Sequence, residues 1–145
     1  MKKILSLLVL GSILGAAPAF AHSSFQHETC RLYLPITQDV SGWGGLREPL
    51  IEKGYELIET KVDEIRNLPE DSIYAELSYH SRRVNRMKAT CKFSMDLKRI
   101  TQTNPLQSAM FFSKEVQKSY YAPSHHVCRN VENSVLQELP NCVRK

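Results

Sequence analysis

The sequence lacks the short motifs that mark the commoner enzyme classes. It contains no GxSxG, no glycine-rich phosphate loop, no HExxH and no EF-hand spacing. Two acidic pairs, at residues 63–64 and 70–71, each lie at adjacent positions in a polar segment. Two carboxylates placed in that way do not face each other across a substrate. These absences argue against a hydrolase, kinase or metalloprotease of a familiar type.

Internal repeats, low-complexity segments and an apolar run of membrane-spanning length are absent as well. The apolar run from Ile4 to Leu14 is too short to cross a bilayer. Two lysines precede it and the small residues of APAFA follow it, which is the pattern of a secretory signal peptide. We expect residues 1–21 to be cleaved after Ala21, although a cut two residues earlier also satisfies the small-x-small rule. The first cysteine is Cys30, so a lipid-anchored N-terminus is not indicated.

The chain has little excess charge of either sign. Loss of Lys2 and Lys3 with the leader leaves 17 basic against 15 acidic residues, so the formal net charge falls from +4 to +2. This balance argues against dedicated nucleic-acid binding. Cleavage leaves 124 of the 145 residues, a length that suits one domain with one core.

Period-two alternation of apolar residues predicts most of the strands. It predicts one strand in CRLYLPI, a second in YELIETKV, and a hairpin formed by SIYAELSYHSRR and MKATCKFSMDLKRI around the turn RVNR. In the first hairpin strand Ala75, Leu77 and Tyr79 are expected to point inward, and Tyr74 outward. The inward face of the second strand is expected to consist of Ala89, Cys91, Phe93, Met95 and Leu97. The segment SAMFFSKEVQKSYY fits a strand or a short helix, and its aromatic and β-branched residues favour the strand.

Two helices are expected around this sheet. One helical face is expected to carry Trp43, Leu46, Leu50 and Ile51. Gly54 provides a stop signal, and Pro49 shortens the helix to a start near residue 47. A second helix follows Ser124, its expected N-cap, and ends at Pro140. We therefore predict an α+β domain over residues 30–145: an antiparallel sheet of four or five strands, with a C-terminal helix packed on one face. Residues 22–29 are expected to form a flexible tail.

Four cysteines in an exported chain favour two disulfides. Zinc is the rival, but the nearest pair, Cys128 and Cys142, is 14 residues apart and far from CxxC spacing. The C-terminal helix separates this pair by about 15 Å or more, so bonds from the helix region to the sheet are preferred. We favour Cys91 with Cys128 and Cys30 with Cys142, and the crossed pairing remains open.

His22 would become the first residue of the cleaved chain. Its α-amino group and ring nitrogen could chelate one copper ion, because amine and imidazole ligands suit copper. A second imidazole would have to come from His27, His80, His125 or His126. A chance histidine in a flexible tail is the competing interpretation, and no metal site or cofactor is predicted.

Glu76, His80 and Arg82 project from one face of a predicted strand. A carboxylate, an imidazole and a guanidinium are the groups that a ribonuclease-like hydrolase needs. Residues four apart on a strand are separated by about 13 Å, however, so Glu76 and His80 need help from a neighbouring strand. An ordinary water-facing surface of the sheet is the simpler interpretation.

The end of the predicted hairpin carries Arg82, Arg83, Arg86 and Lys88. Such a patch suits anionic lipid headgroups, acidic glycans or an acidic protein surface. From these features the sequence favours a non-enzymatic binding or accessory protein of the bacterial envelope, periplasmic or secreted, with another envelope or extracellular protein as its partner and peripheral membrane contact as a further option. A small hydrolase acting on RNA and a copper-binding protein are the alternatives.

Overall fold

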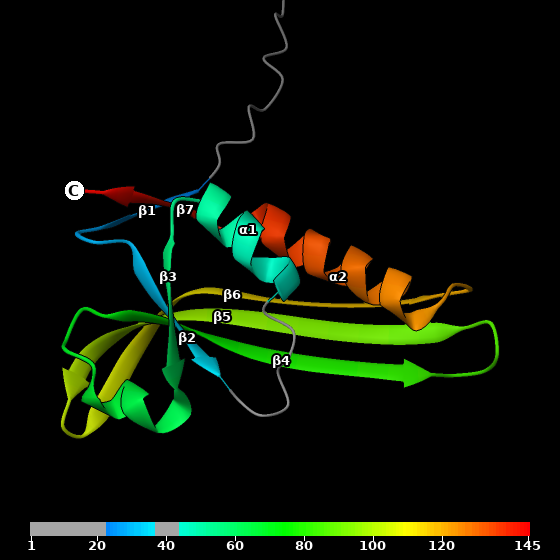
Figure 1. Ribbon diagram of the computed structural model, residues 1–145, viewed down its shortest axis with the longest axis horizontal. Helices are drawn as coiled ribbons and strands as arrows, with labels where there is room; N and C mark the ends of the chain where they lie inside the picture. The colour runs from blue at the N-terminus through cyan, green and yellow to red at the C-terminus, as the bar shows by residue number, and fades with distance from the viewer. Residues whose placement is uncertain (1–22, 37–43) are drawn as a thin grey trace, which may run out of the picture.

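The structure is a computed structural model that describes residues 23–36 and 44–145 (Figure 1). Its elements are β1 (Ser24–His27), β2 (Arg31–Ile36), α1 (Gly44–Glu52), β3 (Glu56–Lys61), the 3₁₀ helix η1 (Val62–Asn67), β4 (Ile73–Arg83), β5 (Ala89–Thr103), β6 (Leu106–Tyr120), α2 (Ser124–Glu138) and β7 (Asn141–Arg144). The protein is therefore α+β. The ambiguous segment after residue 107 is a strand, as the sequence favoured.

The main sheet has five strands in the order β3-β2-β4-β5-β6. Strands β4, β5 and β6 are antiparallel neighbours, but β2 runs parallel to both β3 and β4. The prediction of a purely antiparallel sheet is wrong for this half. The helix α1 lies between β2 and β3 in the chain, and such a crossover brings the second strand back in the same direction.

A second, two-stranded sheet joins the two ends of the described chain. In it β1 pairs in parallel with β7, and Ser24 lies opposite Asn141. The expected flexible tail is thus a strand over Ser24–His27. Four residues carry too little pattern to predict a strand, and the pairing partner lies at the far end of the sequence.

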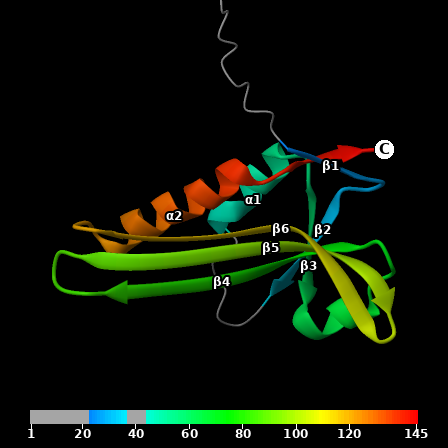
Figure 2. The same ribbon diagram turned by 180° about the vertical axis from the view of Figure 1, so that it is seen from behind.

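The two faces of the main sheet are covered differently. Both α1 and α2 lie on one side, and η1 lies on the other (Figures 1 and 2). The main core lies under the helices and includes Phe93, Met95 and Leu97 from β5 with Val131 and Val135 from α2, all of them buried. The predicted inward face of β5 is confirmed. None of the helices in the described part of the chain is long and apolar enough to cross a membrane.

Strand β4 departs from the expected burial at both ends. Tyr74, expected to face water, is buried with Ile65 and Ile100 in a small second cluster on the η1 side. Tyr79, expected to be in the core, is 50% exposed. Because α2 packs mainly over β5 and β6, the distal half of β4 has little cover from it.

The helix starts also differ from the predictions. Pro123, not Ser124, is the N-cap of α2, and no side chain caps it. Helix α1 begins at Gly44 and continues through Pro49, earlier than the expected start near residue 47. Trp43, placed on this helix by the sequence, lies outside the described residues. Ile51, placed on the same apolar face, is instead 58% exposed.

Two disulfides connect the elements. Cys30 is bonded to Cys142, and Cys91 is bonded to Cys128, which is the pairing that the sequence favoured. The first bond joins the start of β2 to β7. The second joins β5 to α2 and so holds the helix on the sheet.

Candidate functional site

The hairpin turn between β4 and β5 and the connection from β6 to α2 meet at one end of the molecule (Figure 1). We call this end the basic tip. It comprises the cations Arg82, Arg83, Arg86 and Lys88 and the apolar or aromatic side chains of Val84, Met87, Tyr120 and Tyr121. A cation–π contact connects the two segments, with Lys88 Nζ 5.6 Å from the ring centroid of Tyr121.

The turn at the basic tip is ordered by one amide side chain. Asn85 Oδ1 accepts the backbone N–H of Met87 at 2.9 Å and that of Lys88 at 2.7 Å. The Val84 N–H donates to the Lys88 carbonyl oxygen at 2.9 Å. Sequence reasoning did not assign this role to Asn85, although asparagine in a short polar turn often bonds the backbone two or three residues on. The apex is therefore a preformed turn that presents its side chains outward.

The four cations of the basic tip have no acidic partner in the part of the chain that the structure describes. Ion pairs with carboxylates instead involve Arg31, Arg47, Lys92, Lys98, Arg99, Lys114 and Arg144. No acidic residue occurs between Glu76 and Asp96 or between Glu115 and Glu132. The basic tip is thus a surface of one sign.

Apolar side chains are exposed among these cations. Val84 is 54% exposed, Met87 is 72% exposed and Tyr121 is 76% exposed. Large apolar side chains grouped in this way on a small domain often mark a contact surface. The arrangement can therefore offer both cationic and apolar contacts to one partner.

Glu76 and His80 lie on the solvent-facing side of the main sheet, four residues apart on β4. Glu76 is opposite Asp96 and accepts a hydrogen bond from Lys98 Nζ at 2.6 Å, which raises the pKa of Lys98. His80 is opposite Lys92, which pairs with Glu115 at 3.0 Å. The structure does not bring Glu76 and His80 together, and Arg82 belongs to the basic tip.

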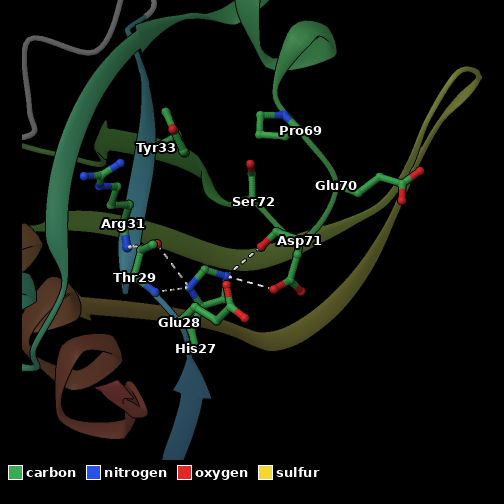
Figure 3. Close-up of a pocket in the computed structure, with 9 residues that line it drawn as sticks. All are labelled: His27, Glu28, Thr29, Arg31, Tyr33, Pro69, Glu70, Asp71 and Ser72. Atoms are coloured by element: carbon green, nitrogen blue, oxygen red, sulfur yellow. Dashed lines mark hydrogen bonds and ion pairs between the residues drawn. The ribbon is translucent and has the colours of Figure 1, made fainter. Parts of the chain in front are cut away.

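His27 is the best-connected polar side chain of the described N-terminal segment and is only 6% exposed (Figure 3). Its Nδ1 accepts the backbone N–H groups of Thr29 and Cys30, at 3.3 and 3.2 Å. Two donors at Nδ1 place the proton on Nε2, which donates to the Asp71 carbonyl oxygen at 2.6 Å. Sequence reasoning missed this network because its partner lies 44 residues away.

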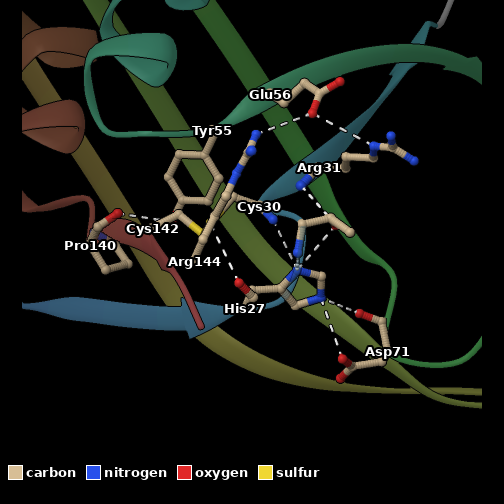
Figure 4. The surroundings of a disulfide bond; sticks show 10 residues. His27, Cys30, Arg31, Tyr55, Glu56, Asp71, Pro140, Cys142 and Arg144 are labelled. Carbon is tan, nitrogen blue, oxygen red and sulfur yellow. Dashed lines mark hydrogen bonds and ion pairs between the residues drawn. A yellow bond between two sulfur atoms is a disulfide. The ribbon is translucent and has the colours of Figure 1, made fainter.

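The His27 ring connects two strained backbone positions. Cys30 and Asp71 have φ values of 53° and 69°, in the left-handed region that non-glycine residues rarely adopt. The imidazole bonds the backbone of both, so we assign His27 a structural role at the Cys30–Cys142 bond (Figure 4). Both of its ring nitrogens are engaged, which leaves neither free for copper.

The copper interpretation depends on His22, which lies outside the described residues. Among the residues that are described, no group of three His, Cys, Asp or Glu side chains is placed to hold a metal ion. His125 and His126 open α2 with their ring centroids 4.2 Å apart.

No protein-family model matches the chain, and no curated protein matches it. Among solved structures, a minor lipoprotein from Acinetobacter baumannii superposes with a TM-score of 0.42 and 12% sequence identity, over 76% of this chain and 88% of that one.

Proposed function

We propose that this chain is a small exported binding protein of the bacterial envelope that acts without catalysis and docks onto an acidic partner through the basic tip. The two disulfides support export, because such bonds form and persist in oxidising compartments. The leader-like pattern of residues 1–21 supports it independently.

The observation that carries the docking role is that four cations without a carboxylate partner lie together at the basic tip. Seven other lysines and arginines of the described chain pair with carboxylates, and Arg82, Arg83, Arg86 and Lys88 do not. Stability alone does not require four cations at one end of a hairpin, since like charges repel. An acidic partner would neutralise them and would be drawn to them at long range.

Export is tested by the intact mass of unreduced protein from the exported fraction. A mass equal to residues 22–145 less four hydrogens is expected, because cleavage removes the mass of residues 1–21 and each disulfide removes two hydrogens. A mass that retains residues 1–21, or one that reveals free thiols, would contradict the proposal.

Docking is tested by retention of the purified protein on isolated envelope material. We expect Arg83→Glu with Arg86→Glu to abolish retention. Two controls should bind like the wild type: Glu76→Gln with His80→Ala, which alters the polar sheet face, and Arg66→Glu with Lys145→Glu, which makes the same change in net charge far from the basic tip. Equal losses in all variants would contradict docking by the tip.

A further inference from the structure

We infer that the acidic partner of the basic tip is an anionic lipid bilayer, which the tip enters end-on. This inference rests on the proposed function and specifies its partner. It requires that the headgroup phosphates meet the four cations while Met87 and Val84 reach the apolar region below them.

The arrangement of the cations favours an end-on approach to a plane. Arg82 and Arg83 are consecutive in β4, so their side chains leave opposite faces of the sheet. Arg86 lies in the turn beyond the strand, and Lys88 lies on its return. The positive charge therefore surrounds the apex instead of covering one face. A partner that docks on one face of the sheet would meet only part of this charge, whereas a membrane met by the apex receives all of it.

The apolar side chains lie where such a contact needs them. Met87 and Val84 are among the more exposed large apolar side chains of the described chain and flank Arg86 in the turn. Arginine and lysine can keep their charged ends at the headgroups while their aliphatic stems lie against apolar surface. The basic tip also exposes Tyr120 and Tyr121, by 44% and 76%. Tyrosine is enriched at the interface between membrane and water.

The shape of the basic tip also fits a membrane better than a protein pocket. A bilayer supplies negative headgroups and an apolar layer together and needs no concave complement. The turn of the tip, residues 84–88, protrudes at the end of the long β4–β5 hairpin (Figures 1 and 2). Three pockets of the described chain are lined by residues elsewhere. The preformed Asn85 turn lets the protein bind without ordering this loop first.

The experiment is co-sedimentation of the disulfide-bonded protein, lacking residues 1–21, with vesicles of phosphatidylcholine, with and without phosphatidylglycerol. We expect binding only to vesicles that contain phosphatidylglycerol. Each cation near an anionic surface contributes about a fivefold gain in partitioning, so the loss of two cations alone should lower partitioning about 25-fold. The two added carboxylates in Arg83→Glu with Arg86→Glu should lower it further. Arg66→Glu with Lys145→Glu should leave it unchanged within about twofold of the wild type, since neither residue belongs to the tip.

The apolar contribution is tested separately with Met87→Ser. Because this side chain is exposed, the variant should fold normally, which circular dichroism checks. When the protein is bound, Met87 would be buried in the bilayer. Its replacement by serine should therefore lower partitioning about tenfold. Unchanged binding of Met87→Ser would overturn entry into the bilayer.

The outcomes separate this inference from the proposed function. The wild type could fail to bind phosphatidylglycerol vesicles while its retention on envelope material still depends on Arg83 and Arg86. In that case the lipid inference fails, and an acidic protein or glycan becomes the partner. If neither binding depends on the basic tip, both proposals fail. An equal loss in the Arg66 and Lys145 control would show that net charge, not the tip, governs vesicle binding, and would also overturn the inference.

Discussion

The two ends of this molecule differ in whether their arginine side chains pair with carboxylates. At the end formed by β1, β7 and the Cys30–Cys142 bond, Arg31 and Arg144 share the carboxylate of Glu56, at 3.6 and 3.5 Å (Figure 4). At the basic tip, Arg83 and Arg86 have no carboxylate partner in the described part of the chain. We call the first the anchored end. Its charges are matched within the protein, and those of the tip remain available to a partner.

The same contrast extends to the forces that hold each end. At the anchored end, a disulfide, the buried hydrogen bond from the Tyr55 hydroxyl to the Pro140 carbonyl oxygen at 2.8 Å, and the His27 network act together. At the basic tip, the turn is ordered by the amide of Asn85 and by backbone hydrogen bonds to Lys88. Stability and binding should therefore be separable by mutation, because different residues serve each.

The largest loss of stability should come from opening the anchored end. In Cys30→Ser with Cys142→Ser, a cross-link between residues 112 apart is removed. By the chain-entropy model this lowers the free energy of unfolding by about 5 kcal/mol, against about 4 kcal/mol for the Cys91–Cys128 bond, whose residues are 37 apart. Urea unfolding of the two double variants measures both values. A larger loss for the Cys91–Cys128 pair would show that holding α2 matters more than joining the ends.

A single methyl group should produce the next largest effect. Gly54 has φ of +89°, and a Cβ added there would lie 2.5 Å from the Cys142 carbonyl oxygen. Gly54→Ala combines backbone strain with a collision against backbone and should lower the free energy of unfolding by about 3 kcal/mol.

Gly45→Ala is the matched control for this substitution. The nearest atom that its Cβ would meet is Glu132 Oε2 at 4.0 Å, and alanine favours the helix α1. We expect this variant to be as stable as the wild type or slightly more stable. A Gly54→Ala variant as stable as Gly45→Ala would mean that movement of β7 relieves the close approach at Gly54.

Alkaline pH should weaken the anchored end in a predictable direction. Burial raises the pKa of Tyr55 well above its ordinary value of 10.0, so the folded state keeps a proton that the unfolded state releases. The contribution of Tyr55 is therefore complete below pH 10 and is lost as the pH rises further, by about 1.4 kcal/mol per pH unit.

Comparison with Tyr55→Phe isolates this effect. Phenylalanine should cost about 1 kcal/mol at neutral pH through the lost hydrogen bond, but the variant should lose less stability between pH 10 and 11. Tyr79, whose pKa is also raised by burial and by the nearby Glu132, is present in both proteins. Parallel stability curves for the two proteins would refute the assignment to Tyr55.

What the sequence could predict differs between the two ends. The β4–β5 hairpin and its basic turn could be predicted because their signals are local: alternation along β5 and a polar turn between two strands. The pairing of β1 with β7 brings together residues more than 100 positions apart, and each strand has only four residues. The roles of His27 and Tyr74 also escaped prediction, because tertiary packing decides them: Asp71 lies 44 residues from His27, and the cover over Tyr74 comes from how η1 folds back against the sheet. The parallel direction of β2 and β3 follows from the crossover through α1. The alternation of apolar residues predicts a strand but not the direction in which it pairs.

The smallest effect on stability should come from the substitutions with the largest effect on binding. Arg83 and Arg86 are exposed and unpaired, so Arg83→Glu with Arg86→Glu should change the free energy of unfolding by no more than about 0.5 kcal/mol. The substitutions also relieve repulsion among the four like charges of the basic tip, which acts in the stabilising direction. Urea unfolding measures the stability of this variant, and the vesicle assay measures its binding, so the two effects can be compared. If this variant were destabilised by as much as Gly54→Ala, the cations would be structural, and the division of labour between the anchored end and the basic tip would be wrong.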